Sequence, residues 1–353
     1  MRANLKIFSF FVLAITHCAV AQDAFFNQYF SAKLFLNPAM ASSENVVTVN
    51  TNFRSQWKSS IIPYKTSQVS LIMPTTKRKG LSEKQGGGVG ISVYNDNAGE
   101  GNFKTTGLYG AYSFDFPLSY DGKSTILSFG LQAGVVQKRV DLSNFQWGSQ
   151  YVPFIGYDAT IQVSDQDFVS QDFTNPIYPD FNAGFVISYN GEKNSYRKSV
   201  NYHFGAAVYH LNTPNESFVS NLESNLPRQI KVHGGLEWKV KEKYRLSPTA
   251  LFITQGGVQH INAGMYVSYQ VIPYGANPLT SETEFLLGTW YRLSDSFIFM
   301  TGLHNKNLTF GFSYDLNGGN LRSAGQGLGA YEISLTISQY KKERLKKIST
   351  PRI

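Results

Sequence analysis

The chain has 353 residues, of which 14% are aromatic and 16% are charged, and its formal net charge is +8. Its one cysteine, Cys18, lies close to the N-terminus, so a chain without its first residues holds no disulfide, no thiolate nucleophile and no cysteine zinc site. No apolar stretch beyond the N-terminal one approaches the ~20 residues of a membrane-spanning helix.

The N-terminus has the pattern of a secretory signal peptide. A basic start is followed by an apolar run over 7–15 and by the small residues Ala19-Val20-Ala21 that signal peptidase reads. The pattern predicts a signal peptide over 1–21. A lipoprotein signal at Cys18 is the alternative, but the neighbouring His17 is larger than the small residue that the lipoprotein signal peptidase usually reads beside the cysteine. For an exported chain we expect lipid and protein partners and no nucleic acid.

Segment 22–41 follows the signal and is predicted to be a periplasmic lead segment. Its apolar side chains are Phe25, Phe26, Tyr29, Phe30, Phe35 and Leu36. A segment this apolar needs a surface to cover. We expect it to fold into the mouth of the domain that follows or to dock on a partner, and an ordered first strand is the alternative.

Residues 42–340 form about fourteen short segments in which apolar and polar side chains alternate. In the last segment, Tyr331 and Ile333 fall on one face of a strand, whereas Glu332 and Ser334 fall on the other. The predicted strands lie near 46–57, 66–73, 87–96, 104–118, 124–137, 182–190, 200–210, 230–240, 244–254, 259–270, 283–292, 295–304, 307–315 and 330–340.

One apolar and one polar face suit a sheet that is closed in a bilayer. A hydrocarbon core leaves free backbone donors and acceptors without partners, so strands that span it must close into a barrel. A soluble β-sandwich alternates in the same way, but the signal peptide and the polar second face of strand after strand favour the barrel. The predicted fold class is all-β: a transmembrane antiparallel β-barrel of about 14 strands in the outer membrane.

Connection lengths predict which barrel end faces the periplasm. The long connections, predicted to be extracellular, are 138–181, 211–229 and 316–329. The tight ones at Ser119–Lys123 and Lys241–Lys243 then fall on the periplasmic side, where short turns belong. Segments 74–86 and 271–282 disagree, because they are long and yet periplasmic. Either a boundary is wrong there or that face carries contact loops.

No pattern for catalysis or for a cofactor is present. The five histidines of the mature chain lie on separate predicted strands and lack metal-ligand spacing: His203, His210, His233, His260 and His304. No GxSxG elbow supports a barrel lipase. The carboxylates that make the 138–181 connection acidic are Asp158, Asp165, Asp167, Asp172 and Asp180. Without an EF-hand pattern, a solvated loop is favoured over a calcium site. We therefore expect that the protein is not an enzyme and that it binds no cofactor and no metal.

The last predicted unit is a basic periplasmic tail over 341–353. Its run Lys341-Lys342-Glu343-Arg344-Leu345-Lys346-Lys347 is strongly basic. A solvated tail or a contact with inner-leaflet phosphates is favoured over specific protein recognition.

Several short blocks, in order along the mature chain, carry a resemblance to a known family. They include Asn27-Gln28-Tyr29, Phe35-Leu36-Asn37-Pro38-Ala39, Phe53-Arg54-Ser55-Gln56-Trp57, Leu127-Ser128-Phe129-Gly130, Pro179-Asp180-Phe181-Asn182-Ala183-Gly184, His210-Leu211-Asn212, Trp290-Tyr291-Arg292 and Glu332-Ile333-Ser334-Leu335. Together they resemble the PorP/SprF family of Bacteroidetes outer-membrane proteins. Met40-Ala41-Ser42 departs from the family pattern, and nothing is carried over to the tail.

The resemblance implies a role that the residues alone do not show. Members belong to the type IX secretion system, associate with its periplasmic ring lipoproteins, and in gliding bacteria serve the secretion or surface attachment of a large adhesin with a type IX C-terminal signal domain. We therefore expect a non-enzymatic barrel that couples such an adhesin to periplasmic machinery. A diffusion channel or hydrophobic-solute transporter is the alternative, and a barrel enzyme is more remote.

Aromatic residues are the expected partner contacts, because binding energy concentrates in a few such anchors. On the periplasmic side we expect Phe25, Phe26 and Tyr29. In the extracellular loops we expect Trp147, Phe154, Tyr157 and Phe218.

Overall fold

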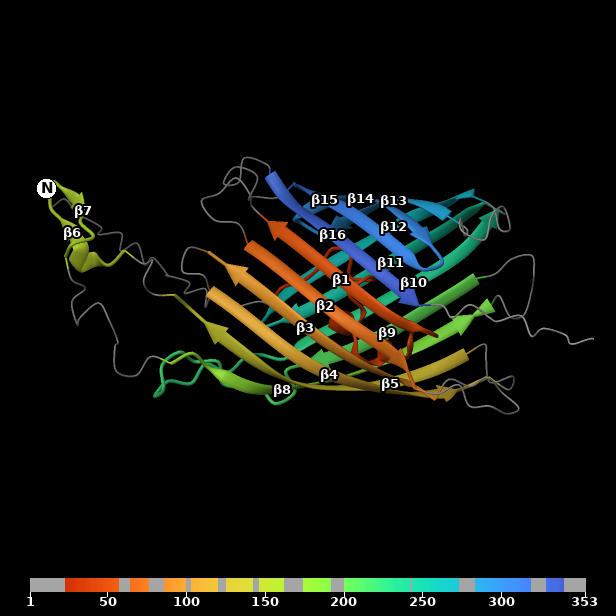
Figure 1. Cartoon of the computed structure of the whole chain (residues 1–353), viewed down its shortest axis with the longest axis horizontal. Helices are drawn as coiled ribbons and strands as arrows, with labels where there is room; N and C mark the ends of the chain where they lie inside the picture. The colour runs from red at the N-terminus through yellow and green to blue at the C-terminus, as the bar shows by residue number, and fades with distance from the viewer. Residues whose placement is uncertain are drawn as a thin grey trace, which may run out of the picture.

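The computed structural model describes residues 23–56, 64–75, 86–99, 103–119, 125–141, 146–161, 174–191, 200–241, 243–272, 283–318 and 328–339. Within them, fourteen strands form one closed antiparallel barrel (Figure 1). The predicted fold class and strand number are therefore confirmed. The predicted signal peptide, 1–21, and the basic tail, 341–353, lie outside the described residues.

Each barrel strand pairs with its neighbours in sequence, and the last strand pairs with the first. The barrel strands are β1 (Val47–Gln56), β2 (Tyr64–Pro74), β3 (Gly88–Ala98), β4 (Phe103–Pro117), β5 (Thr125–Arg139), β8 (Ile177–Asn190), β9 (Val200–Tyr209), β10 (Gln229–Lys241), β11 (Tyr244–Gln255), β12 (Val258–Ile272), β13 (Thr283–Arg292), β14 (Ser296–Asn305), β15 (Leu308–Asn317) and β16 (Leu328–Gln339). The barrel is closed by the pairing of β1 with β16, which extends from the pair Val47↔Gln339 to the pair Gln56↔Ala330. A small hairpin, β6 (Tyr151–Val152) with β7 (Gly156–Tyr157), lies in the connection between β5 and β8.

The two faces of the strands differ as the alternation predicts. On β16, Glu332 and Ser334 are buried, whereas Ile333 and Ile337 are exposed on the outer face. Outward rings pair near the barrel ends, for example Tyr244 with Tyr269 at 5.0 Å between centroids. Such rings form the aromatic girdles of an outer-membrane barrel. None of the helices in the described part of the chain has the length and apolar character of a membrane span.

The barrel has two distinct ends. We call the end where β1 begins with Val47 and β16 ends with Gln339 the terminal end, and the opposite one, where β5 ends and β8 begins, the loop end. The connections after β5, β9 and β15, which are the predicted long loops, join strands at the loop end. The tight connections after β4 and β10 join strands at the terminal end, and so do the long connections after β2 and β12. Which end faces the periplasm stays a prediction.

Candidate functional site

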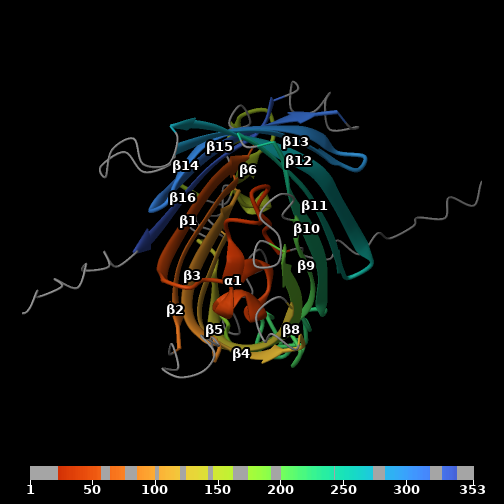
Figure 2. The ribbon, with the colours of Figure 1, turned by 90° about the vertical axis from the view of Figure 1, so that its right-hand side faces the viewer.

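The lead segment and the two residues that follow it lie inside the barrel lumen, over residues 23–43. This stretch contains a helical turn, α1 (Lys33–Leu36), and a 3-10 turn, η1 (Pro38–Ser42), and Figure 2 shows α1 inside the ring of strands. Leu34 and Asn37 are fully buried there. The sequence left open whether this segment folds into the barrel or docks on a partner. In the structure it occupies the lumen, and we call it the plug.

Two arginines and one aspartate of the wall form the charged centre of the lumen. The Asp315 carboxylate accepts from Arg54 Nη2 at 3.4 Å and from Arg292 Nη2 at 3.3 Å. The plug joins this group through Asn27, whose side-chain amide donates to Asp315 and accepts from Arg292 Nη1 at 2.9 Å. Buried charges persist only when paired and hydrogen-bonded, and here the plug supplies part of the pairing.

Wall side chains also bind the main chain of the plug. Glu332 accepts from the backbone N–H groups of Asn27 at 2.7 Å and Gln28 at 3.1 Å. Arg54 Nη1 donates to the Phe25 carbonyl at 2.7 Å, and Lys231 Nζ donates to the Phe35 carbonyl at 2.7 Å. These contacts satisfy backbone groups of the plug that are buried or partly buried.

Glycines of the wall let the plug approach closely. A Cβ atom at Gly130 would lie 2.1 Å from the backbone nitrogen of Ala39. One at Gly88 would lie 1.9 Å from the Ala41 carbonyl oxygen. At these inward positions only glycine leaves room for the backbone of η1.

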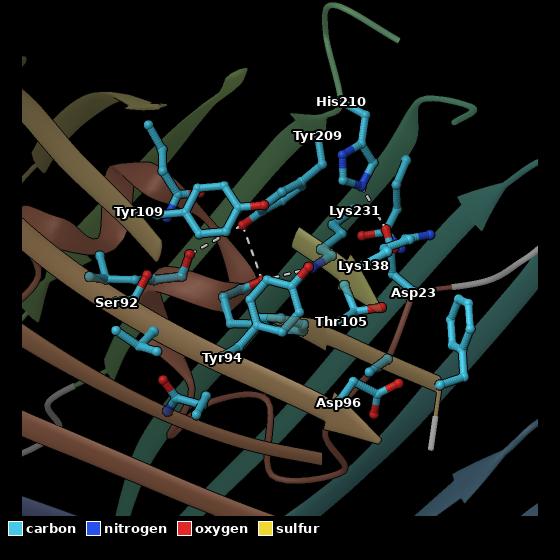
Figure 3. A pocket seen from close by; sticks show the side chains of 18 residues that line it. Asp23, Ser92, Tyr94, Asp96, Thr105, Tyr109, Lys138, Tyr209, His210 and Lys231 are labelled. Atoms are coloured by element: carbon cyan, nitrogen blue, oxygen red, sulfur yellow. Dashed lines mark hydrogen bonds and ion pairs between the residues drawn. The ribbon is translucent and has the colours of Figure 1, made fainter. Parts of the chain in front are cut away.

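At the loop end, the first described residue of the plug is held by a histidine between two carboxylates. His210 Nε2 lies 2.6 Å from the Asp23 carboxylate, and His210 Nδ1 lies 3.0 Å from that of Asp180. Tyr109 donates to Asp180 at 2.7 Å. Gln255 Nε2 donates to the Asp23 carboxylate at 3.0 Å. Figure 3 shows Asp23, Tyr109 and His210 around a small cavity of about 80 Å³. We call the contact between Asp23 and His210 the latch.

Charge stabilises the latch over a defined pH range. Burial lowers the pKa of His210, but the carboxylates of Asp23 and Asp180 outweigh it and raise that pKa to about 9. Burial raises the pKa of Asp23, but the charge and hydrogen bond of His210, together with the charges of Lys231 and Lys138, outweigh this and lower it below the ordinary 3.8. The contribution of the charged His210 to stability is complete below its ordinary pKa of 6.5, and it is lost as pH rises through about 9. The Asp23 contribution is present above 3.8 and is lost as pH falls through the lowered pKa.

We therefore expect alkaline pH to loosen the loop-end part of the plug. Amide hydrogen exchange at residues 23–28 should be faster at pH 10 than at pH 6, after correction for the intrinsic rate. In His210→Gln, which cannot be charged, the corrected rate should already be raised at pH 6 and change little between the two values. The same pH-dependent rise in both proteins would show that the latch is not the titrating contact.

At the terminal end the lumen widens into two adjoining cavities of about 390 and 290 Å³. Both are lined by Phe30 of the plug and by Glu237 and Tyr266 of the wall. Arg245 bridges Glu237 at 2.7 Å and Glu284 at 3.1 Å. The plug therefore closes the lumen mainly toward the loop end and leaves a polar vestibule at the terminal end.

The residues expected to contact a periplasmic partner lie inside the barrel. Phe26 and Tyr29 are buried, and Tyr29 donates its hydroxyl to Thr249 at 2.8 Å. Phe25 lies under the guanidinium groups of Arg54 and Arg292, 4.5 and 4.9 Å from its ring centre. A partner reaches these side chains only if the plug leaves the lumen, so their role in binding stays a prediction.

The residues expected to contact an extracellular partner lie in two places. Phe154 and Tyr157 are exposed on the hairpin of β6 and β7, and Phe154 is 108% exposed. Trp147 comes just before this hairpin and is half-buried. Phe218 lies apart from them, in the connection between β9 and β10, with its ring 5.7 Å from that of Phe103. The structure thus brings three of the four together.

Sequence reasoning missed the wall residues that hold the plug. Asp180 was expected in a solvated loop, and that placement is wrong: it is fully buried on β8, which begins at Ile177 rather than near 182. Residues 177–181 pair with β5, so this Pro-containing stretch continues the sheet. Asp158 lies beside the exposed hairpin, and Asp165, Asp167 and Asp172 lie outside the described residues.

Histidines of the wall contact the plug inside the lumen. His233 lies 3.1 Å from Asn37 of the plug, and the His260 ring lies 5.2 Å from the Phe25 ring. Among the described residues, no group of three or more histidines, cysteines and carboxylates has the arrangement of a metal site. A charged residue at an inward position of a barrel strand, such as Arg54 or Glu332, was the signal available in the sequence.

Comparisons with known proteins identify the family. The model of the type IX secretion system membrane protein PorP/SprF matches residues 19–337. A search of curated proteins gave no match. Among solved structures, the toluene transporter TbuX of Ralstonia pickettii is similar at 9% identity with a TM-score of 0.41, over 88% of this chain and 94% of that one.

Two further solved barrels are equally distant. BamA from Haemophilus ducreyi, lacking POTRA domains 1–3, is similar at 9% identity with a TM-score of 0.40, over 84% of this chain and 71% of that one. A FadL homologue from Pseudomonas aeruginosa is similar at 10% identity with a TM-score of 0.42, over 88% and 94%. Likenesses this remote carry no argument about function. Because the family model covers most of the sequence, this chain is an outer-membrane β-barrel that belongs to the PorP/SprF family of type IX secretion system membrane proteins.

Proposed function

We propose that this protein is a non-enzymatic component of the type IX secretion system that is needed for the secretion or surface attachment of a large adhesin in gliding motility. In this role it couples the adhesin, through its type IX C-terminal signal domain, to the periplasmic ring lipoproteins of the secretion apparatus. The adhesin would bind at the loop end and the lipoproteins at the terminal end.

The observation that carries this proposal is the filled lumen. The plug extends from Asp23 at the loop end to Ser42 near the terminal end, and wall side chains bind it along its length. A barrel filled in this way offers two faces for binding rather than an open pore. The filled lumen therefore favours a binding role over the diffusion channel or hydrophobic-solute transporter.

Deletion of the gene with complementation tests the proposal. The adhesin should disappear from the surface of the deletion strain and return with the wild-type gene, and ring lipoproteins should co-purify with the tagged protein. Normal adhesin display in the deletion strain, together with a tagged barrel free of partners, would refute it.

The hairpin at the loop end gives a sharper test. Phe154→Ser should weaken adhesin binding by about 30-fold, the effect of losing a ~2 kcal/mol hot spot. Barrel levels should not change, because the side chain is exposed. Leu222→Ser, which also changes an exposed apolar residue at this end, is the matched control and should bind normally. Unchanged adhesin retention in Phe154→Ser would remove this residue from the interface.

A further inference from the structure

The plug has its two ends at opposite ends of the barrel. The backbone N–H of Asp23 donates at 3.1 Å to Gln255, the last residue of β11, and its carboxylate meets His210, which follows β9. Both of these contacts are at the loop end. At the other end of the plug, the Ser42 hydroxyl donates to that of Ser128 at 3.2 Å, near the start of β5. The chain then enters β1 at the terminal end.

We infer that the N-terminal end of the mature chain stands on the loop face, opposite the C-terminal end of β16. The plug is then a fifteenth crossing of the membrane, made inside the lumen. An ordinary even-stranded barrel has both chain ends on one side. Here the plug connects the two faces, so it is an element through which binding at one face can act on the other. This last step rests on the proposed function, whereas the position of the N-terminal end does not.

The contacts of the plug suit a crossing that is shielded from lipid. Its backbone groups are bound by Glu332, Arg54 and Lys231, all from inward positions on the wall. Polar side chains such as Asn27 and Asn37 are buried against the wall rather than in hydrocarbon. A segment without an apolar helix therefore crosses with its polar groups satisfied.

The latch joins the loop-end part of the plug to an ordered loop. His210 has a left-handed backbone, with φ at 58°, and opens the connection 210–228. Within this connection, Glu216 N donates to the Ser224 carbonyl at 2.9 Å and Leu226 N to the Pro214 carbonyl at 2.9 Å. An ion pair between Glu216 and Lys138 ties the loop to β5. A displacement of this loop would thus be transmitted to Asp23 through His210.

Epitope accessibility tests the inference in the full chain. A short epitope is inserted between Gln22 and Asp23 in one strain and after Ile353 in another. Antibody binding is compared in intact and permeabilised cells, with heat-modifiable migration as the check on folding. We expect the two epitopes to lie on opposite sides of the membrane. Both epitopes on one side would overturn the inference.

Two cysteine variants calibrate the faces, because Cys18 is the only cysteine of the chain and lies within the predicted signal peptide. Phe154→Cys reports the loop end, and Asn307→Cys, in the exposed turn after β14, reports the terminal end. A membrane-impermeant maleimide should label the first in intact cells and the second only after permeabilisation. Whichever way the barrel is inserted, we expect the N-terminal epitope to be accessible under the same condition as Phe154→Cys, in intact or in permeabilised cells.

If the inserted epitope prevents folding, Ala24→Cys replaces it, because Ala24 lines the loop-end cavity and is not fully buried. If Ala24→Cys is labelled under the same condition as Phe154→Cys, in intact or in permeabilised cells, the inference is supported. If it is labelled under the same condition as Asn307→Cys, the inference is overturned. Adhesin display is measured in the same strains. Normal display in the deletion strain, together with opposed chain ends in these variants, would contradict the proposed function and leave the crossing intact.

Discussion

Replacing Asp315 with alanine is expected to lower the free energy of unfolding by about 3–5 kcal/mol, the cost of breaking a buried ion pair by removing one partner. Its carboxylate lies between Arg54 and Arg292, and all three side chains are almost completely buried. Without it, the two guanidinium groups face each other, and the remaining nearby carboxylates are Glu332 and Asp295, which pairs with Arg292. The urea midpoint of the heat-modifiable band of the purified protein measures the loss.

Asp158→Ala is the control for this substitution. Asp158 lies beside the hairpin of β6 and β7, where its carboxylate accepts from the backbone N–H of Thr160 at 2.9 Å in solvent. Its removal should leave the urea midpoint within experimental error. An equal, small shift in both variants would show that the charged centre of the lumen contributes little to stability.

Gly130→Val is expected to unseat the plug. A Cβ atom at this position meets the backbone of Pro38 and Ala39 at 2.1 to 2.4 Å, and backbone atoms cannot rotate away as a flexible side chain can. The clash falls on η1, so the terminal-end part of the plug has to leave its place. We expect the variant to show channel steps in a planar bilayer and to be cut by added protease within residues 23–43.

Gly110→Val is the matched control, because a Cβ atom at Gly110 has no other atom within 4 Å and this glycine is exposed on the outer face of β4. It adds the same side chain to a neighbouring strand of the barrel. It should fold, stay closed and resist protease. A closed, protease-resistant Gly130→Val protein would show that the wall does not need glycine to seat the plug.

The strands were predictable because each carries its own signal. Alternation such as Ile333 and Ile337 against Glu332 and Ser334 depends only on the period of a strand, so fourteen strands and their closure followed from the sequence. The start of β8 was missed because Pro179 and Asp180 are typical of loops. Their place in the sheet is set by β5, a partner that local propensity does not include.

The lumen site was only partly predictable. The apolar lead segment had to cover a surface, but nothing in its own residues says which one. The blocks that carry the family resemblance meet in the structure around the plug. Asn27 and Gln28 bind Glu332, Asn37 binds β8 and β9, and Asp180 holds His210. These contacts join residues far apart in sequence, so no local pattern reveals them.

Conductance of the full-length protein tests the central claim of a plugged, binding barrel most directly. Purified wild-type protein is inserted into a planar bilayer, with Gly130→Val as the open reference. We predict a closed baseline for the wild type at moderate voltage and discrete steps for the variant. A stable open channel in the wild type would contradict the plugged lumen and favour a diffusion channel over a coupling role.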